Sequence, residues 1–81
     1  MSLAVLRVFT ADNCRHSQDL CADLRRRGVE FEEVNLSREP ARLAELRSLS
    51  QEHRLPVIVH RERVSIGFRG SSSTFAELGM E

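Results

Sequence analysis

The sequence predicts a single α/β domain in which a four-stranded mixed sheet carries three helices on its two faces, in the order β-α-β-α-β-β-α. Short apolar runs rich in Val, Leu, Ile and Phe alternate with segments of helical periodicity, and two late runs flank Arg61-Glu62. A strand–helix–strand order implies parallel pairing through a right-handed crossover, whereas a hairpin adds antiparallel strands. The 81 residues leave room for one domain, residues 1–81, with a modest core.

The first strand is predicted over Leu3–Phe9, and the first helix over Cys14–Arg27 after a polar turn. Asp12 or Asn13 is the expected N-cap, because a short polar side chain accepts hydrogen bonds from the first free amides of a helix. Gly28 is the expected terminator of the helix. The buried face predicted from spacings of three and four residues contains Cys14, Ser17, Leu20, Cys21 and Leu24.

Three further strands and two further helices complete the predicted fold. The strands are Val29–Leu36, Val57–His60 and Arg63–Gly67, and the helices are Ser37–His53 and Phe75–Leu78. Glu77 follows Thr74 by three residues, which is the spacing of a capping box at the start of a helix.

Composition excludes several classes of function. Twelve arginines, with no lysine, balance twelve acidic residues, so the formal net charge is zero and gives no general attraction to nucleic acid or anionic membranes. Four Phe without Trp or Tyr provide no base-stacking surface. No apolar run approaches the roughly 20 residues of a membrane helix, and the first residues do not read as a signal peptide. We therefore expect a cytoplasmic protein without nucleic-acid or membrane partners.

Cys14 lies between a turn and the start of a predicted helix. The free amides and the dipole of a helix N-terminus favour a thiolate over a thiol, and Arg15 and His16 add positive potential. A thiolate is the nucleophile of disulfide exchange, so this position favours a reactive cysteine. An inert Cys14 in a fold kept for another purpose remains the alternative.

Cys21 is not expected to form a disulfide with Cys14. Seven residues of helix separate the two by roughly 10 Å, at a rise of about 1.5 Å per residue. A disulfide needs a distance between Cα atoms of about 4.4–6.8 Å. Cys21 is therefore expected to be a small core residue, a common role for free cysteine.

Five segments of the chain, in this order and spacing, resemble the glutaredoxins. They are Val8-Phe9-Thr10, Cys14-Arg15-His16-Ser17, residues 28–36, Leu55-Pro56-Val57-Ile58-Val59 and residues 64–68. The resemblance implies a thioredoxin-like fold. It also implies that Cys14, the first residue of a C-x-x-S motif, attacks a mixed disulfide, usually one with glutathione. Ser17 replaces the second cysteine of the dithiol members, as in the monothiol class, and its hydroxyl is expected to hydrogen-bond the Cys14 sulfur.

The resemblance also implies a binding groove for glutathione or a substrate thiol. Pro56 matches the family's cis-proline, and Leu55 before it would offer its backbone to the bound thiol. Gly67-Phe68-Arg69 is similar to the glutaredoxin-like electron donors of ribonucleotide reductase, which take electrons from thioredoxin reductase. The serines at 71–73 are expected to offer a carboxylate site at a helix N-terminus. The complete predicted binding set is Arg15, Leu55, Pro56, Gly67, Phe68, Arg69 and Ser71.

Two departures from the family pattern bear on ligands. Ala11 stands where the family has a lysine that pairs with a glutathione carboxylate, and Phe68 replaces the second glycine of a Gly-Gly-Asp motif. Weak or absent glutathione binding is therefore expected, with Arg15, Arg54 and Arg69 as candidate replacements for the lysine. Arg15-His16 is bulkier than the C-G-F-S pattern of cluster-binding members, so an iron–sulfur cluster is not expected. No metal site or required cofactor is predicted, and glutathione remains a candidate co-substrate.

Two functions follow as hypotheses. The first is a glutaredoxin-like thiol-disulfide oxidoreductase that works through the single thiol of Cys14. Its partners would be glutathione or protein disulfides, with a thioredoxin reductase or another reductase as the source of electrons. The second is a non-enzymatic module of thioredoxin-like fold that binds a partner or senses redox state through a degenerate glutathione site.

Overall fold

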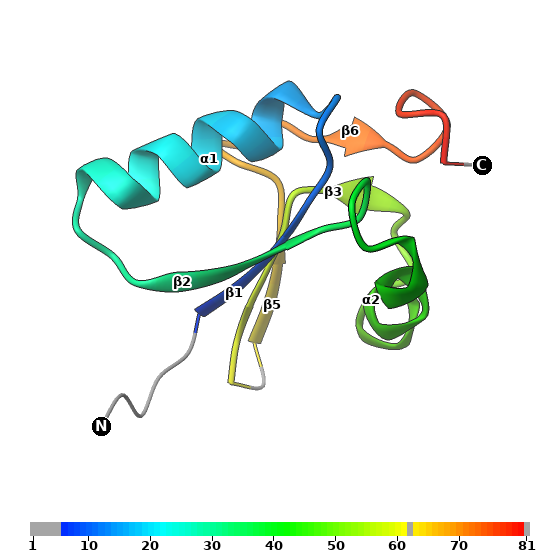
Figure 1. The fold of residues 1–81 in the computed structure, drawn as a ribbon, viewed down its shortest axis with the longest axis horizontal. Coiled ribbons are helices and arrows are strands. Elements are labelled where there is room, and N and C mark those ends of the chain that lie inside the picture. The colour runs from blue at the N-terminus through cyan, green and yellow to red at the C-terminus, as the bar shows by residue number, and fades with distance from the viewer. Residues whose placement is uncertain (1–5, 62, 81) are drawn as a thin grey trace.

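The computed structural model describes residues 6–61 and 63–80. Its centre is a four-stranded sheet in the order β2-β1-β4-β5 (Figure 1). The strands are β1 (Leu6–Thr10), β2 (Phe31–Asn35), β4 (Val57–His60) and β5 (Arg63–Ile66). β1 pairs parallel with β2 and antiparallel with β4, and β4 pairs antiparallel with β5. The predicted mixed sheet is therefore confirmed.

The helices lie on opposite faces of this sheet (Figure 1). The described residues form two α-helices, α1 (Arg15–Arg26) and α2 (Leu43–Leu49). Successive side chains of a strand point to opposite faces, so β1 supplies both layers. Val8 packs with Leu20 of α1, whereas Phe9 belongs to the cluster that contains Leu46 of α2.

Two clusters of buried side chains form the core. The α2-side cluster contains Phe9, Ala11, Cys14, Val34, Leu36, Leu46, Leu55, Val57, Val59, Phe75 and Leu78. The α1-side cluster contains Val8, Leu20 and Cys21. The two cysteines therefore lie in separate parts of the core, and both are free.

The first helix begins and ends differently from the prediction. Its N-cap is Cys14 rather than Asp12 or Asn13, and no side chain among the described residues caps it. At the other end Gly28 has a φ of 72°, and the Val29 N–H donates to the Leu24 carbonyl at 2.9 Å. This closing turn uses the residues expected to start the second strand, so β2 begins only at Phe31. Residues 3–5 of the first predicted strand, and Glu62 of the predicted hairpin, lie outside the described residues.

The second helix is much shorter than the predicted Ser37–His53. A 3-10 turn, η1 (Pro40–Arg42), leads into α2, and residues 37–39 are not helical. A proline disfavours helical backbone in the residue before it, and Glu39 has φ −128° and ψ 66°. At the other end Ser50 is extended, with φ −148° and ψ 135°. Three leucines at three-residue spacing were expected to form the buried stripe of this helix, but Leu46 is buried, Leu43 is partly buried and Leu49 is exposed.

The third predicted helix, Phe75–Leu78, is wrong. The capping box itself forms, because the Glu77 N–H donates to Thr74 Oγ1 and the Thr74 N–H donates to Glu77 Oε1, both at 3.1 Å. Residues 75–79 nevertheless make only a set of turns, which Gly79 ends with a φ of 74°. Thr74 instead lies in a strand that the sequence did not predict.

That strand belongs to a second, two-stranded sheet. It consists of β3 (Arg54–Leu55) and β6 (Ser73–Thr74), which pair antiparallel with Leu55 opposite Ser73. Figure 1 shows β6 at the end of the main sheet where α1 begins. Extended backbone therefore lies near the start of α1, where the third helix was predicted (Figure 1).

Replacement of Leu46 by Ala should lower the free energy of unfolding by about 2–5 kcal/mol, because it leaves a cavity in the α2-side cluster. Leu46 is 1% exposed, whereas Leu49 in the same helix is 38% exposed. Leu49→Ala is the matched control and should cost well under half as much. Urea unfolding followed by circular dichroism measures both variants. Equal losses would contradict the assignment of the buried face of α2.

Candidate active site around Cys14

Cys14 is placed by the end of β1 and the start of α1. Its backbone is extended, with φ −96° and ψ 102°, as expected of an N-cap residue. The Cys14 N–H donates to the Ala11 carbonyl at 3.1 Å, and the Cys14 carbonyl accepts from the Gln18 N–H at 3.2 Å. The next amides of α1 therefore remain at the helix end beside the cysteine, where their partial positive charge favours an anion.

The thiol of Cys14 is covered. Cys14 is 0% exposed and belongs to the α2-side cluster with Ala11, Leu55, Phe75 and Leu78. The position therefore combines the electrostatics of a helix N-terminus with apolar surroundings. A disulfide in solution can reach the sulfur only after some of these neighbours move.

The turn before Cys14, which contains Asp12 and Asn13, is hydrogen-bonded to three other parts of the chain. Gln18 of α1 donates a side-chain hydrogen bond to the Asp12 carbonyl. Asn35, the last residue of β2, donates from Nδ2 to Asp12 Oδ1 at 2.8 Å, and Ser37 Oγ just after the strand accepts from the Asp12 N–H at 2.9 Å. Asn13 Nδ2 donates to the Leu78 carbonyl, also at 2.8 Å. The sequence prediction missed these residues because every bond except that of Gln18 joins distant segments.

Ser17 lies one helical turn after Cys14, and its side chain is fully buried. Its Oγ has no hydrogen-bond partner among the described residues. The expected hydrogen bond from this hydroxyl to the Cys14 sulfur is therefore not formed here. A buried hydroxyl without a partner destabilises a fold, so Ser17 is a local weakness beside the thiol.

The segment before β4 lies next to Cys14. The Leu55–Pro56 peptide bond is cis, and both residues are buried. Leu55 shares the α2-side cluster with Cys14. The Pro56 carbonyl accepts from the Gly67 N–H at 2.8 Å, so Gly67 adjoins the same segment.

Gly67 begins a tight turn that directs the next residues away from Cys14. A Cβ added at Gly67, where φ is 91°, would lie 2.8 Å from the Ser71 carbonyl oxygen. Phe68 and Ser71 exchange backbone hydrogen bonds of 2.7 and 2.9 Å, and Arg69 and Gly70 have positive φ values of 53° and 79°. The half-buried Phe68 packs against the α1-side cluster, so it does not border the Cys14 thiol.

Arg69 is also directed toward α1. Its guanidinium lies 5.1 Å from the centre of the Phe68 ring and 3.9 Å from the buried carboxylate of Asp23. Asp23 lies nine residues after Cys14 on α1, about 13 Å along the axis at 1.5 Å per residue. The predicted binding set therefore splits: Leu55 shares the cluster of Cys14 and is followed by Pro56, which Gly67 contacts, whereas Phe68 and Arg69 contact the α1 side.

The remaining predicted binding residues are exposed. Arg15 is the first residue of α1, and Ser71 takes part in the tight turn through its backbone. Ser72 Oγ accepts a hydrogen bond from Arg54 at 3.1 Å. The expected carboxylate site at a helix N-terminus is wrong here, because no helix follows these serines among residues 63–80.

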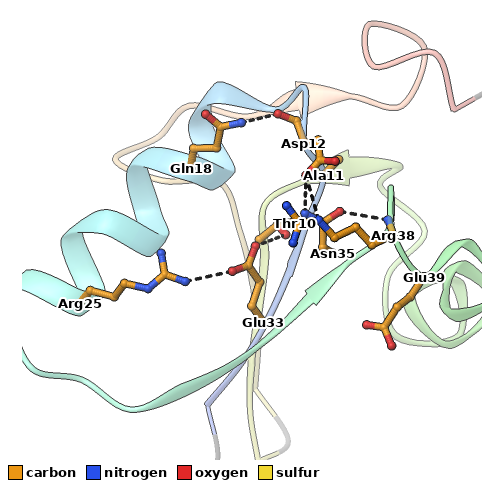
Figure 2. A pocket seen from close by; sticks show the side chains of 9 residues that line it. All are labelled: Thr10, Ala11, Asp12, Gln18, Arg25, Glu33, Asn35, Arg38 and Glu39. Atoms are coloured by element: carbon orange, nitrogen blue, oxygen red, sulfur yellow. Dashed lines mark hydrogen bonds and ion pairs between the residues drawn. The ribbon is translucent and has the colours of Figure 1, made fainter.

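A polar cavity of about 580 Å³ opens beside α1 at the carboxyl ends of β1 and β2 (Figure 2). Its lining includes Ala11, where the family lysine was expected, together with Arg25 and Arg38. Glu33 accepts from Thr10 Oγ1 at 2.9 Å and pairs with Arg25 at 3.1 Å. None of the three arginines proposed to replace the lysine lines this cavity, and Arg38 is the arginine near Ala11 instead.

Cys21 is a core residue, as predicted. Burial raises the pKa of its thiol from 9.0 to about 11, with Glu33 acting in the same direction and Arg25 against it. At neutral pH this thiol is therefore protonated and a poor nucleophile. Among residues 6–61 and 63–80, no three histidine, cysteine or acidic side chains are grouped as metal ligands, and no helix is long and apolar enough to cross a membrane.

Ser17→Ala should raise the free energy of unfolding by about 1 kcal/mol, because it removes a buried hydroxyl without a partner. Ser48→Ala is the matched control, since Ser48 also lies in a helix but donates to the Glu45 carbonyl at 2.7 Å. Urea unfolding of both variants separates loss of the hydroxyl from the higher helix propensity of Ala. Destabilisation by Ser17→Ala would mean that the hydroxyl has a partner in solution.

Cys21 should make stability fall at alkaline pH. Its folded pKa of about 11 lies above the ordinary value of 9.0, so its contribution is complete below about pH 9 and is lost as pH rises toward 11. The chain has no Lys or Tyr to titrate in the same window. Urea unfolding across this range should therefore show a decline that Cys21→Ala reduces. An identical decline in the variant would contradict the raised pKa.

Comparison with known proteins agrees with this architecture. The family model described as glutaredoxin matches residues 6–64. Among solved structures, the glutaredoxin Grx-1 of Archaeoglobus fulgidus superposes with a TM-score of 0.73 at 22% identity, covering 84% of this chain and 79% of that chain. The glutaredoxin-like protein NrdH-redoxin of Escherichia coli superposes with a TM-score of 0.68 at 26% identity, covering 79% and 83%.

No curated protein matches the chain. The two structural neighbours confirm the predicted thioredoxin-like α/β fold. The family match begins at β1, includes Cys14 and the Leu55–Pro56 segment, and covers well over half of the sequence. This chain therefore belongs to the glutaredoxin family.

Proposed function

We propose that this redox protein is a thiol-disulfide oxidoreductase that uses Cys14 as its single nucleophilic thiol on mixed disulfides. The observation that carries the proposal is the position of Cys14 at the uncapped N-terminus of a 12-residue helix, in one cluster with Leu55 of the Leu55–Pro56 segment. Amides at that helix end stabilise the attacking thiolate. No other cysteine shares this setting.

The proposed reaction has two exchange steps. The Cys14 thiolate attacks one sulfur of a mixed disulfide, a Cys14–S–S bond forms, and the other sulfur leaves as a thiolate that takes up a proton. An external thiolate then attacks the sulfur bonded to Cys14, forms a disulfide with it and releases Cys14 as a thiolate, so each mixed disulfide reduced consumes one molecule of external thiol. Ser17 has no sulfur and Cys21 lies in the α1-side cluster, which is why the resolving thiol is external.

Glutathione is the first external thiol to test. The cavity beside Ala11 offers Arg25 and Arg38 to the carboxylates of a small peptide thiol, which supports this choice despite the missing lysine. The similarity to NrdH-redoxin, a protein with a thioredoxin-like activity profile, supports a thioredoxin reductase as the alternative source of electrons. Assays with each reductant in turn separate the two.

One observation favours a second candidate function. Cys14 is 0% exposed, and a covered thiol suits a module that binds a partner or responds to oxidation only after a conformational change. Such a module would keep the fold and the partner surface without turnover. The absence of catalysis from a folded protein with intact Cys14 would favour this function.

Treatment with glutathione disulfide should add one glutathione to Cys14 and none to Cys21, because only Cys14 lies at a helix N-terminus. Mass spectrometry of proteolytic peptides locates the adduct. Cys14→Ser should abolish both the adduct and the reduction of a glutathionylated peptide, while Cys21→Ala serves as the matched control and retains both. A folded wild-type protein that gains no adduct would contradict the enzymatic function.

A further inference from the structure

We infer that residues 73–80 form a cover over Cys14 and that the hydrogen bond from Asn13 to the Leu78 carbonyl is its latch. Opening of this cover would determine how often a disulfide can reach the thiol. The inference rests on the proposed function, since it concerns access to the same sulfur. It assigns Asn13 as a positioning residue that acts through Cys14.

This segment contributes side chains to the cluster in which Cys14 is buried. Phe75 and Leu78 are buried members of the α2-side cluster that contains Cys14, and Met80 packs against that cluster. The turn residues Asp12 and Asn13 share a cavity of about 400 Å³ with residues 78–80, so the two segments face one another. Residues 75–80 thus lie against the turn that carries Cys14 and share its cluster, which is why we assign them as the cover.

The cover is attached at two ends. At one end β6 pairs with β3, the Phe75 N–H donates to the His53 carbonyl at 2.8 Å, and the rings of these two residues stack 5.2 Å apart. At the other end Asn13 Nδ2 donates to the Leu78 carbonyl at 2.8 Å. Asn13 immediately precedes Cys14, so the latch joins the cover directly to the reactive turn.

The segment is built to open locally. It consists of a two-residue strand and a set of turns ended by Gly79, where φ is 74°. The Thr74–Glu77 capping box holds the first turn from the solvent side. Most backbone hydrogen bonds of residues 75–80 join residues of the segment itself, and segments with little regular structure open more often than core strands or helices. The cover can therefore leave Cys14 while the main sheet and α1 stay folded.

The same movement would free the backbone of Leu55. The Phe75 N–H donates to the His53 carbonyl, so these two residues form a hydrogen-bonded pair of the antiparallel ladder. Along such a ladder, hydrogen-bonded and non-hydrogen-bonded residue pairs alternate. Leu55 and Ser73, two residues farther along, therefore occupy the next hydrogen-bonded position. A target chain that pairs with Leu55 must first displace Ser73, so one opening exposes both the thiol and the backbone beside it.

Alkylation of Cys14 by iodoacetamide tests the latch. Asn13→Ala removes the donor, and Asn13→Asp replaces it with an acceptor facing a carbonyl. Each should raise the Cys14 alkylation rate by about fivefold, the ratio for loss of one hydrogen bond worth about 1 kcal/mol. Cys21 is the internal reference for global unfolding, because it is buried in the other cluster. Because Cys21 is reached only by global unfolding, its rate should stay far below the Cys14 rate in every folded variant.

Ser37→Ala is the matched control variant. Ser37 holds the same turn through the Asp12 N–H but makes no contact with Leu78 through that bond, so this variant loosens the turn and leaves the latch. The Cys14 rate should stay near that of the wild type. Unchanged Cys14 rates in both folded Asn13 variants, or a Cys14 rate no higher than that of Cys21, would overturn the inference.

The outcome is separable from that of the proposed function. Suppose that the Asn13 variants are alkylated faster but no variant reduces a glutathionylated peptide. This result would support the cover and contradict the proposed enzymatic activity. Suppose instead that the wild type reduces the peptide and the Asn13 substitutions leave the Cys14 alkylation rate unchanged. This result would support the enzymatic activity and contradict the cover.

Discussion

Burial of β1 on both faces and pairing on both edges is the constraint on which this domain depends. Val8 and Phe9 are fully buried on opposite faces, and the strand pairs with β2 and β4. Each pairing also fixes the register of its neighbours. The end of β1 at Thr10 is therefore a fixed point, and the turn that carries Cys14 starts from it. The position of the Cys14 thiol is therefore determined mainly by β1 and less by the contacts that Cys14 itself makes.

Two opposing effects meet at Cys14. The helix end offers partial positive charge to a thiolate, whereas the α2-side cluster surrounds the sulfur with apolar groups. Reactivity and access are thus separate properties of the same residue. In the proposed function α1 supplies the first, and in the proposed cover the segment after β6 controls the second.

Arginine side chains connect α1 to two other parts of the domain through ion pairs. Arg25 pairs with Glu33 of β2, and Arg69 of the turn after β5 approaches Asp23. Both guanidinium groups are exposed to solvent, so these pairs contribute little to stability individually and their main effect is orientation. In consequence Phe68 and Arg69 lie along α1, away from the thiol. Of the binding residues that the family resemblance implied, all of which the structure describes, only Leu55 belongs to the same buried cluster as Cys14.

Local patterns in the sequence determined the strands of the main sheet, the first helix, the Thr74–Glu77 capping box and the separation of the two cysteines. Each rests on side-chain periodicity or on spacing within a few residues, which a chain carries in any context. Tertiary structure decided the rest. The length of α2 depended on the backbone around Pro40, and the loss of the third helix on pairing of Thr74 with Arg54, twenty residues earlier. The burial of Cys14, the latch from Asn13 and the turn of Phe68 toward α1 all arise from contacts between segments distant in sequence. Such contacts leave no local periodicity, and only packing and hydrogen bonding across the folded chain establish them.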